Sequence, residues 1–129
     1  MVKRNTSEAL TALVLDDQRE LAEMLAERLH LEGFQSSVAV TAAEGLTLAT
    51  QRSFEVAFVD LKLPDMSGIV VAAELRKVRA KMKIFLITGL AASVDEVEPG
   101  WTHIDGVLPK PWRPSELEAI LQELGRERE

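Results

Sequence analysis

Residues 54–68 read FEVAFVDLKLPDMSG, a mostly apolar run that stops at the carboxylate of Asp60 and continues into a turn-forming segment. The run from Phe54 to Val59 is short, rich in β-branched and aromatic residues and interrupted only by Glu55, which indicates a buried strand. Open parallel α/β sheets bind ligands at the carboxyl ends of their strands. Asp60 therefore occupies a position where a functional carboxylate is expected.

The chain on either side of this run alternates between strand and helix patterns. We expect strands at Leu10–Leu15, Gln35–Val40, Phe54–Val59, Ile84–Ile87 and Gly106–Leu108. Helices are expected between them, the first carrying Leu21, Met24, Leu25 and Leu29 and ending at Gly33. This alternation predicts an α/β fold, a five-stranded parallel doubly wound sheet with helices on both faces.

Capping signals mark where three of the helices begin. Thr41 followed by Glu44 predicts a capping box for a helix that begins at Ala42. Ser67 is expected to cap a helix that continues through Val78, and Pro114 suits the first position of the last helix.

Length and composition limit the classes of protein that this chain can belong to. Its 129 residues predict one domain, residues 10–125, between short tails at 1–9 and 126–129. The absence of Cys excludes a disulfide scaffold and a thiolate metal site, and the formal net charge of −6 argues against general nucleic-acid binding. With neither a signal peptide nor an apolar run long enough to span a bilayer, we expect a soluble, cytoplasmic protein without membrane contact.

Polar residues follow the predicted strands in a regular order. Asp16 and Asp17 follow the first strand, Asp60 the third, Thr88 the fourth and Lys110 the fifth. Parallel strands end at one edge of a sheet, so we expect these side chains to converge. Three neighbouring carboxylates favour a hard cation such as Mg²⁺, and a carboxylate beside it can attack a phosphoryl group that a lysine and a hydroxyl stabilise.

Each of these residues also has a purely structural interpretation. Asp17 can cap the first helix, Asp60 can start a turn, and Thr88 can simply end a strand. Lys110 alone carries no information, since most lysines are solvated. Their order along the chain favours the site over the separate interpretations.

In four stretches the chain resembles the receiver domains of two-component response regulators. These are LVLDD at 13–17, VDLKLPDMSG at 59–68, LITG at 86–89 and LPKPW at 108–112. The resemblance covers about residues 10 to 124 and implies the receiver, or flavodoxin-like, strand order 2-1-3-4-5. It also implies that Asp60 is the phosphoacceptor. Asp17, Asp60 and the backbone carbonyl of Lys62 would hold Mg²⁺, and Asp16 would help mainly through water.

The same resemblance implies the remaining roles and the partners. Thr88 and Lys110 would hold the phosphoryl oxygens and convey the change to the output surface. The phosphoryl donor would be a phosphohistidine of a sensor histidine kinase or a histidine phosphotransfer protein. Such a domain is not a turnover enzyme, since it catalyses only its own phosphorylation and dephosphorylation. The downstream target and the oligomeric state do not follow from the sequence.

Two departures from the family pattern concern signalling and not phosphorylation. Val107 stands where family members usually carry an aromatic switch residue. The fourth helix, expected between Ala91 and about His103, is interrupted by Pro99-Gly100 and should be short or irregular. We therefore expect intact phosphorylation and an atypical signalling surface.

Three other functions are alternatives to a stand-alone receiver. The chain can be a receiver excised from a hybrid kinase or a DNA-binding regulator, although no helix-turn-helix pattern follows Leu124. A Mg²⁺-dependent phosphohydrolase with Asp60 as nucleophile usually needs a second acid where this chain has Lys62. A flavin-binding module would need a Gly/Ser/Thr-rich loop after the first strand, which the sequence lacks.

Overall fold

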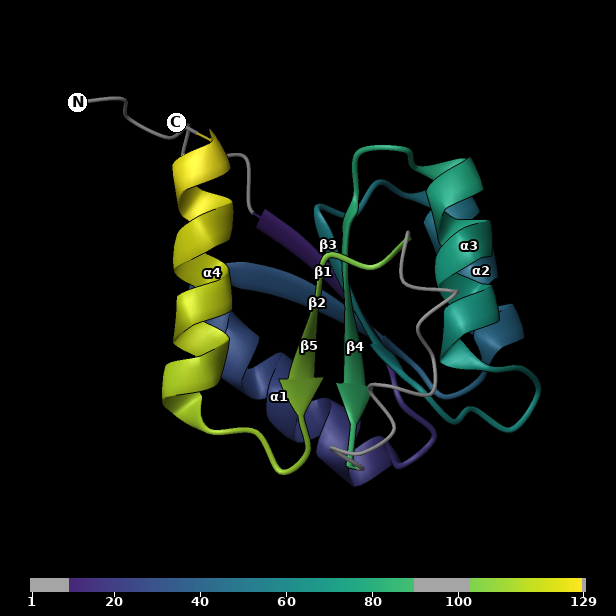
Figure 1. Cartoon of the computed structure of the whole chain (residues 1–129), viewed down its shortest axis with the longest axis horizontal. Helices are drawn as coiled ribbons and strands as arrows, with labels where there is room; N and C mark the ends of the chain where they lie inside the picture. Colours follow the sequence, from purple (N-terminus) through teal and green to yellow (C-terminus); the bar gives the residue numbers. More distant parts are fainter. Residues whose placement is uncertain (1–9, 90–102, 129) are drawn as a thin grey trace.

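The computed structural model describes residues 10–89 and 103–128, in which five parallel strands form one sheet (Figure 1). The strands are β1 (Leu10–Leu15), β2 (Phe34–Ala39), β3 (Val56–Asp60), β4 (Lys83–Thr88) and β5 (Gly106–Pro109). The helices are α1 (Arg19–Leu31), α2 (Ala42–Gln51), α3 (Gly68–Val78) and α4 (Pro114–Arg128). The strand order β2-β1-β3-β4-β5 confirms the predicted fold class and topology.

Helices cover both faces of the sheet, which produces two apolar cores (Figure 1). Leu13 and Val59 point into the core under α2 and α3, whereas Val14 and Phe58 point into the core under α1 and α4. Because successive strand residues enter opposite cores, the central strands are apolar along their whole length. This explains why β3 reads as a continuous apolar run up to Asp60.

Three of the predicted helix-end signals are confirmed. The Thr41 hydroxyl accepts from the Glu44 N–H at 3.1 Å, and the Ser67 hydroxyl accepts from the Ile69 N–H at 3.1 Å. The Glu44 carboxylate reaches back to the N–H of Val40 at 3.0 Å, one residue earlier than in a standard capping box. Gly33 has a φ of 96°, a left-handed conformation that favours glycine just beyond a helix.

The start and the buried face of α1 differ from the sequence prediction. The helix buries Ala22, Leu25 and Leu29, while Leu21 and Met24 are 37% and 57% exposed. The apolar residues of this helix cover a wider arc than the sheet can bury, so those at one edge of the arc, Leu21 and Met24, face solvent. The N-cap residue is Gln18, without a side-chain cap bond, so the interpretation of Asp17 as a cap is wrong.

Smaller differences and gaps concern the ends of elements. The second strand lies at Phe34–Ala39, one residue before its predicted bounds, and β3 begins at Val56. Val107 on β5 is half-buried against the core under α2 and α3.

The predicted irregular helix after Ala91 falls on residues 90–102, outside the described ranges. Among the described residues, no helix is both long enough and apolar enough to cross a membrane.

Candidate functional site

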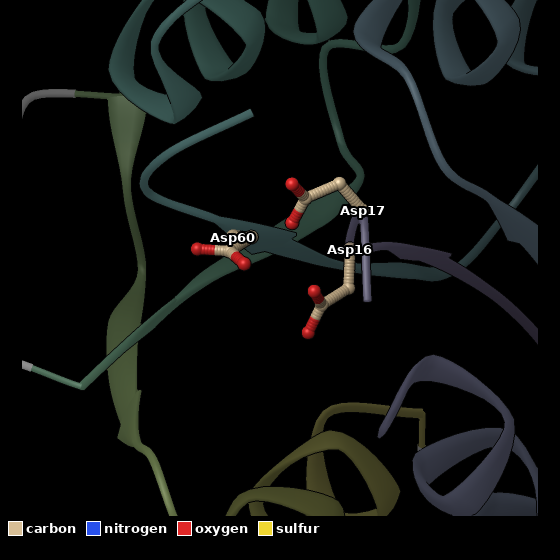
Figure 2. A group of neighbouring side chains, drawn as sticks. All are labelled: Asp16, Asp17 and Asp60. Atoms are coloured by element: carbon tan, nitrogen blue, oxygen red, sulfur yellow. The ribbon is translucent and has the colours of Figure 1, made fainter. Parts of the chain in front are cut away.

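Three aspartates meet at the carboxyl edge of the sheet, where the two central strands end (Figure 2). Asp60 is the last residue of β3, and Asp16 and Asp17 directly follow β1. One carboxylate oxygen from each lies within 4.8 Å of the others. Asp16 and Asp60 are 2% and 8% exposed, whereas Asp17 is open to solvent. The group therefore combines two buried acids with one accessible acid.

Strand pairing explains why Asp16 and Asp60 are neighbours. In the parallel ladder Leu15 of β1 pairs with Val59 of β3, so the next residue of each strand is an aspartate. The Asp16 N–H donates to the Ala39 carbonyl at 3.1 Å, and its Oδ1 accepts from the Gln18 N–H at 3.0 Å. These bonds fix Asp16 between the sheet and the start of α1.

Lys110 lies between the two buried carboxylates. Its Nζ donates to Asp16 Oδ2 at 2.9 Å and to Asp60 Oδ2 at 3.2 Å. The Lys110 N–H donates to the Thr88 carbonyl at 2.8 Å, which ties the residue to the end of β4. The peptide bond between Lys110 and Pro111 is cis. The ammonium thus neutralises part of the negative charge of the group.

A hollow of about 450 Å³ opens beside these residues. Its lining includes Asp17, Asp60, Lys62, Thr88 and Lys110. Thr88, the last residue of β4, is 7% exposed and carries a hydroxyl that can donate a hydrogen bond. The hollow therefore combines carboxylates, an ammonium and a hydroxyl around one space.

The loop from Asp60 to α3 is folded tightly against the strand end. The Lys62 N–H donates to Asp60 Oδ1 at 3.1 Å, the turn contact expected of an aspartate at this position. The Gly68 N–H donates to the Leu61 carbonyl at 2.8 Å, and Lys62 forms an isolated antiparallel bridge with Ser67. A Cβ at Gly68 would collide with the Asp60 carbonyl oxygen, so this close approach requires glycine.

Burial and neighbouring charges shift the pKa values of Asp60 and Lys110. Burial, supported by the neighbouring carboxylate of Asp16, raises the pKa of Asp60 above its ordinary value. Burial alone would lower the pKa of Lys110, but the hydrogen bonds and charges of Asp16 and Asp60 outweigh it, so the pKa of Lys110 is raised. One ammonium does not relieve the cost of ionising Asp60.

The donor set fits a hard divalent cation. Mg²⁺ takes oxygen ligands and is usually bound by one or two carboxylates while keeping several waters. Asp17 and Asp60 supply carboxylate oxygens that line the hollow, and a cation there would favour the ionised form of Asp60, whose pKa is raised mainly by burial.

All six residues that the sequence singled out lie at this edge: Asp16, Asp17, Asp60, Lys62, Thr88 and Lys110. Their chemical roles remain predictions. Asp65 was not among the predicted site residues, but its carboxylate accepts hydrogen bonds from the first two N–H groups of α2. An acid in a loop at the same sheet edge as a helix start is a signal that could have pointed to it.

A family model and several known proteins match most of the chain. The family model described as the response regulator receiver domain matches residues 12–122. The probable transcriptional regulator ycf27 of Cyanidium caldarium is 32% identical over 114 residues, which cover 88% of this chain and 45% of the relative. The chain spans about half the length of the curated relatives it matches.

Two solved structures of similar proteins match the fold over 94% and 89% of this chain. A response regulator receiver domain protein (CheY-like) from Methanospirillum hungatei has a TM-score of 0.84 and 30% identity, covering 94% of this chain and 98% of its own. The response regulator protein TrrA from Thermotoga maritima, in complex with Mg²⁺-BeF, has a TM-score of 0.81 and 27% identity. That match covers 89% of this chain and 98% of TrrA.

Proposed function

The chain belongs to the family of response regulator receiver domains, and from this premise we propose that Asp60 accepts a phosphoryl group from a phosphohistidine. The donor would be a sensor histidine kinase or a histidine phosphotransfer protein. The observation that carries the proposal is the position of Asp60. Its carboxylate ends a buried central strand, contacts Lys110 at 3.2 Å and faces a hollow that Thr88 also lines.

The proposed reaction moves the phosphoryl group from nitrogen to oxygen. A carboxylate oxygen of Asp60 forms a bond to phosphorus while the bond from phosphorus to the imidazole nitrogen of the donor breaks. The electron pair of that bond returns to the imidazole. Hydrolysis of the resulting acyl phosphate by water restores the carboxylate and releases inorganic phosphate. The domain therefore undergoes one cycle of modification and does not turn over an independent substrate.

The neighbouring side chains would stabilise the charge that spreads over the phosphoryl oxygens. When bound by Asp17, Asp60 and the Lys62 carbonyl, Mg²⁺ would offset negative charge on the phosphoryl group. The Lys110 ammonium would exchange its contact with Asp60 for a phosphoryl oxygen, and the Thr88 hydroxyl would donate to another. The Lys62 N–H, 3.1 Å from Asp60 Oδ1, would orient the carboxylate for attack.

The direct test is Mg²⁺-dependent phosphorylation by a small donor such as acetyl phosphate. Wild type should acquire one acyl phosphate that hydroxylamine removes, and Asp60→Asn should acquire none. Glu23→Gln, which removes an exposed acid on α1, is the matched control and should label like wild type. Labelling that survives in Asp60→Asn would contradict the proposal.

We also propose that the output passes to another protein surface or domain. Several relatives are named transcriptional regulators, but the chain covers only about half of their length. With a formal net charge of −6, the receiver itself is not expected to bind nucleic acid. The alternative of a phosphohydrolase is not favoured, since Lys62 occupies the place of its second acid.

A further inference from the structure

The carboxylate of Asp65 links the loop of the proposed phosphoacceptor site to a neighbouring helix. Asp65 lies in the same loop as Lys62, but its Oδ1 accepts from the Ala42 N–H at 2.9 Å and its Oδ2 from the Ala43 N–H at 3.0 Å. Ala42 and Ala43 are the first residues of α2. Each oxygen thus takes an N–H group that a helix start leaves without an intrahelical partner.

The interaction favours the ionised form of Asp65. The two backbone hydrogen bonds lower the pKa of this carboxyl, although the side chain is exposed. A negative charge at the start of a helix is also favourable to the helix dipole. The link between the loop and α2 is therefore present at neutral pH.

The other contacts of the loop lie closer to the strand ends: the Leu61 N–H donates to the Ile87 carbonyl of β4 at 2.9 Å. Lys62 contacts Asp60 through its N–H and pairs with Ser67 in a local bridge. Leu63 is buried in the core under α2 and α3. Asp65 instead connects the outer part of the loop to the backbone of α2 through two hydrogen bonds.

We infer that Asp65 is a positioning residue for the metal site, because its double hydrogen bond to α2 holds the Lys62 backbone in register with Asp60. The inference rests on the proposed function, in which the Lys62 carbonyl and Asp60 bind Mg²⁺. Residues that orient metal ligands without touching the metal are known to affect affinity. Without the link, the loop samples more conformations, and ordering it opposes metal binding.

Thr41 offers a matched control at the same helix start. Its hydroxyl caps α2 by accepting from the Glu44 N–H at 3.1 Å. Thr41→Ala and Asp65→Ala both remove side-chain acceptors from the start of α2, but only Asp65→Ala releases the loop. If both variants weaken Mg²⁺ binding, the cause is the lower stability of α2. If only Asp65→Ala weakens it, the cause is the released loop.

The experiment measures the Mg²⁺ dissociation constant by isothermal titration calorimetry, with urea unfolding of each variant in parallel. We expect Asp65→Ala to bind Mg²⁺ about tenfold more weakly, at the lower end of the range for such residues. Thr41→Ala should bind like wild type although its unfolding midpoint falls. Unchanged affinity in Asp65→Ala, or equal weakening in Thr41→Ala, would overturn the inference.

A salt series separates positioning from simple attraction between Asp65 and the cation. The attraction of an exposed charge is screened between about 0.1 M and about 0.5 M KCl, whereas a change in loop geometry is not. A loss of affinity in Asp65→Ala that persists at the higher salt supports positioning, and one that disappears there overturns it.

Asp60→Asn distinguishes failure of this inference from failure of the proposed function. If wild type binds no Mg²⁺, or Asp60→Asn binds it equally well, both the proposed site and the role of Asp65 are wrong. If binding depends on Asp60 but Asp65→Ala matches wild type, only the role of Asp65 is wrong.

Discussion

Asp60 is a buried carboxyl group whose ionised form is disfavoured by burial. Its carboxylate lies beside Asp16, and the ammonium of Lys110 contacts both acids. The raised pKa of Asp60 shows that the ionised form costs the folded protein more than it costs the unfolded chain. The metal-free site is therefore a source of instability that a bound cation would relieve.

The first prediction follows from the sign of that shift. Because the folded-state pKa of Asp60 is raised, the stability of the metal-free protein falls as pH rises from the ordinary value of 3.8 to the folded pKa, and stays lower above it. At about pH 8, Asp60→Asn should therefore unfold at a higher urea concentration than wild type in EDTA.

Adding Mg²⁺ should reverse this order. A cation at a hundred times its dissociation constant stabilises a folded protein by about 2.7 kcal/mol. Wild type should gain this amount, and Asp60→Asn should gain much less because it lacks one of the proposed ligands. A variant less stable than wild type in EDTA, or equally stabilised by Mg²⁺, would contradict the prediction.

Among the elements, the start of α2 depends on the loop after β3. Asp65 binds the N–H groups of Ala42 and Ala43, and this lowers its pKa below the ordinary value of 3.8. A lowered folded-state pKa gives stability that is present above the unfolded value and is lost as pH falls through the folded value.

Urea unfolding of wild type and Asp65→Asn should show this pH dependence. The variant should be less stable at every pH above about 4, and the difference should shrink toward zero at lower pH as Asp65 becomes protonated. Thr41→Ala is the control, since its hydroxyl does not titrate and its deficit should stay constant. A deficit of Asp65→Asn that remains undiminished at about pH 2 would refute the assignment.

The start of α3 sets a second constraint at the level of elements. A Cβ at Gly68 would meet the Asp60 carbonyl oxygen and the Leu61 Cα, both backbone atoms that cannot rotate away. Gly68→Ala should therefore cost about 1–3 kcal/mol of unfolding free energy, the usual cost of overpacking. It should also weaken Mg²⁺ binding, because the loop must shift next to Asp60.

Gly125→Ala is the matched control for this substitution. Gly125 lies in α4, and a Cβ there would meet no atom within 4 Å. Removing a glycine from an open helical position should stabilise the protein by about 0.5–1 kcal/mol. Urea unfolding with calorimetric Mg²⁺ titration checks both variants, and equal effects of the two would exclude a special role for Gly68.

Prediction of the elements from sequence succeeded where a local rule was sufficient. Thr41 and Ser67 are caps whose partners lie two or three residues away, so spacing alone identified them. The exposure of Leu21 and Met24 was not predictable, because the orientation of α1 depends on which residues the sheet can cover. The link from Asp65 to α2 joins groups 22 and 23 residues apart, so the spacing rules that identify helix caps do not reach it.

At the scale of the whole molecule, stability depends on the two cores that share the sheet. Phe58 on β3 is fully buried, and its ring stacks on Phe85 of β4 with centroids 5.8 Å apart. Phe58→Ala should cost about 3–5 kcal/mol, a large part of the stability of a typical domain. Urea unfolding tests this, with exposed Leu31→Ala as a control expected to change stability by at most about 0.5 kcal/mol.

The location of the site was predictable at this scale, because residues that follow successive parallel strands lie at the same edge of the sheet. Once the strands are known to be parallel, residues such as Asp16, Asp60 and Thr88 must lie at one edge. The approach of Lys110 to the acids was predicted in the same way, but its two ion pairs were not, since its side chain crosses from the end of β5 to strands that β5 does not touch.

Those ion pairs span much of the chain. Lys110 and Asp16 are 94 residues apart, and Lys110 and Asp60 are 50 apart. Bringing such distant residues together costs loop-closure entropy, which slows the folding of chains rich in long-range contacts. During synthesis on the ribosome, a nascent chain that has not yet delivered β5 has its acids but not their ammonium. We therefore expect the proposed phosphoacceptor site to be complete only in molecules whose whole sheet has formed.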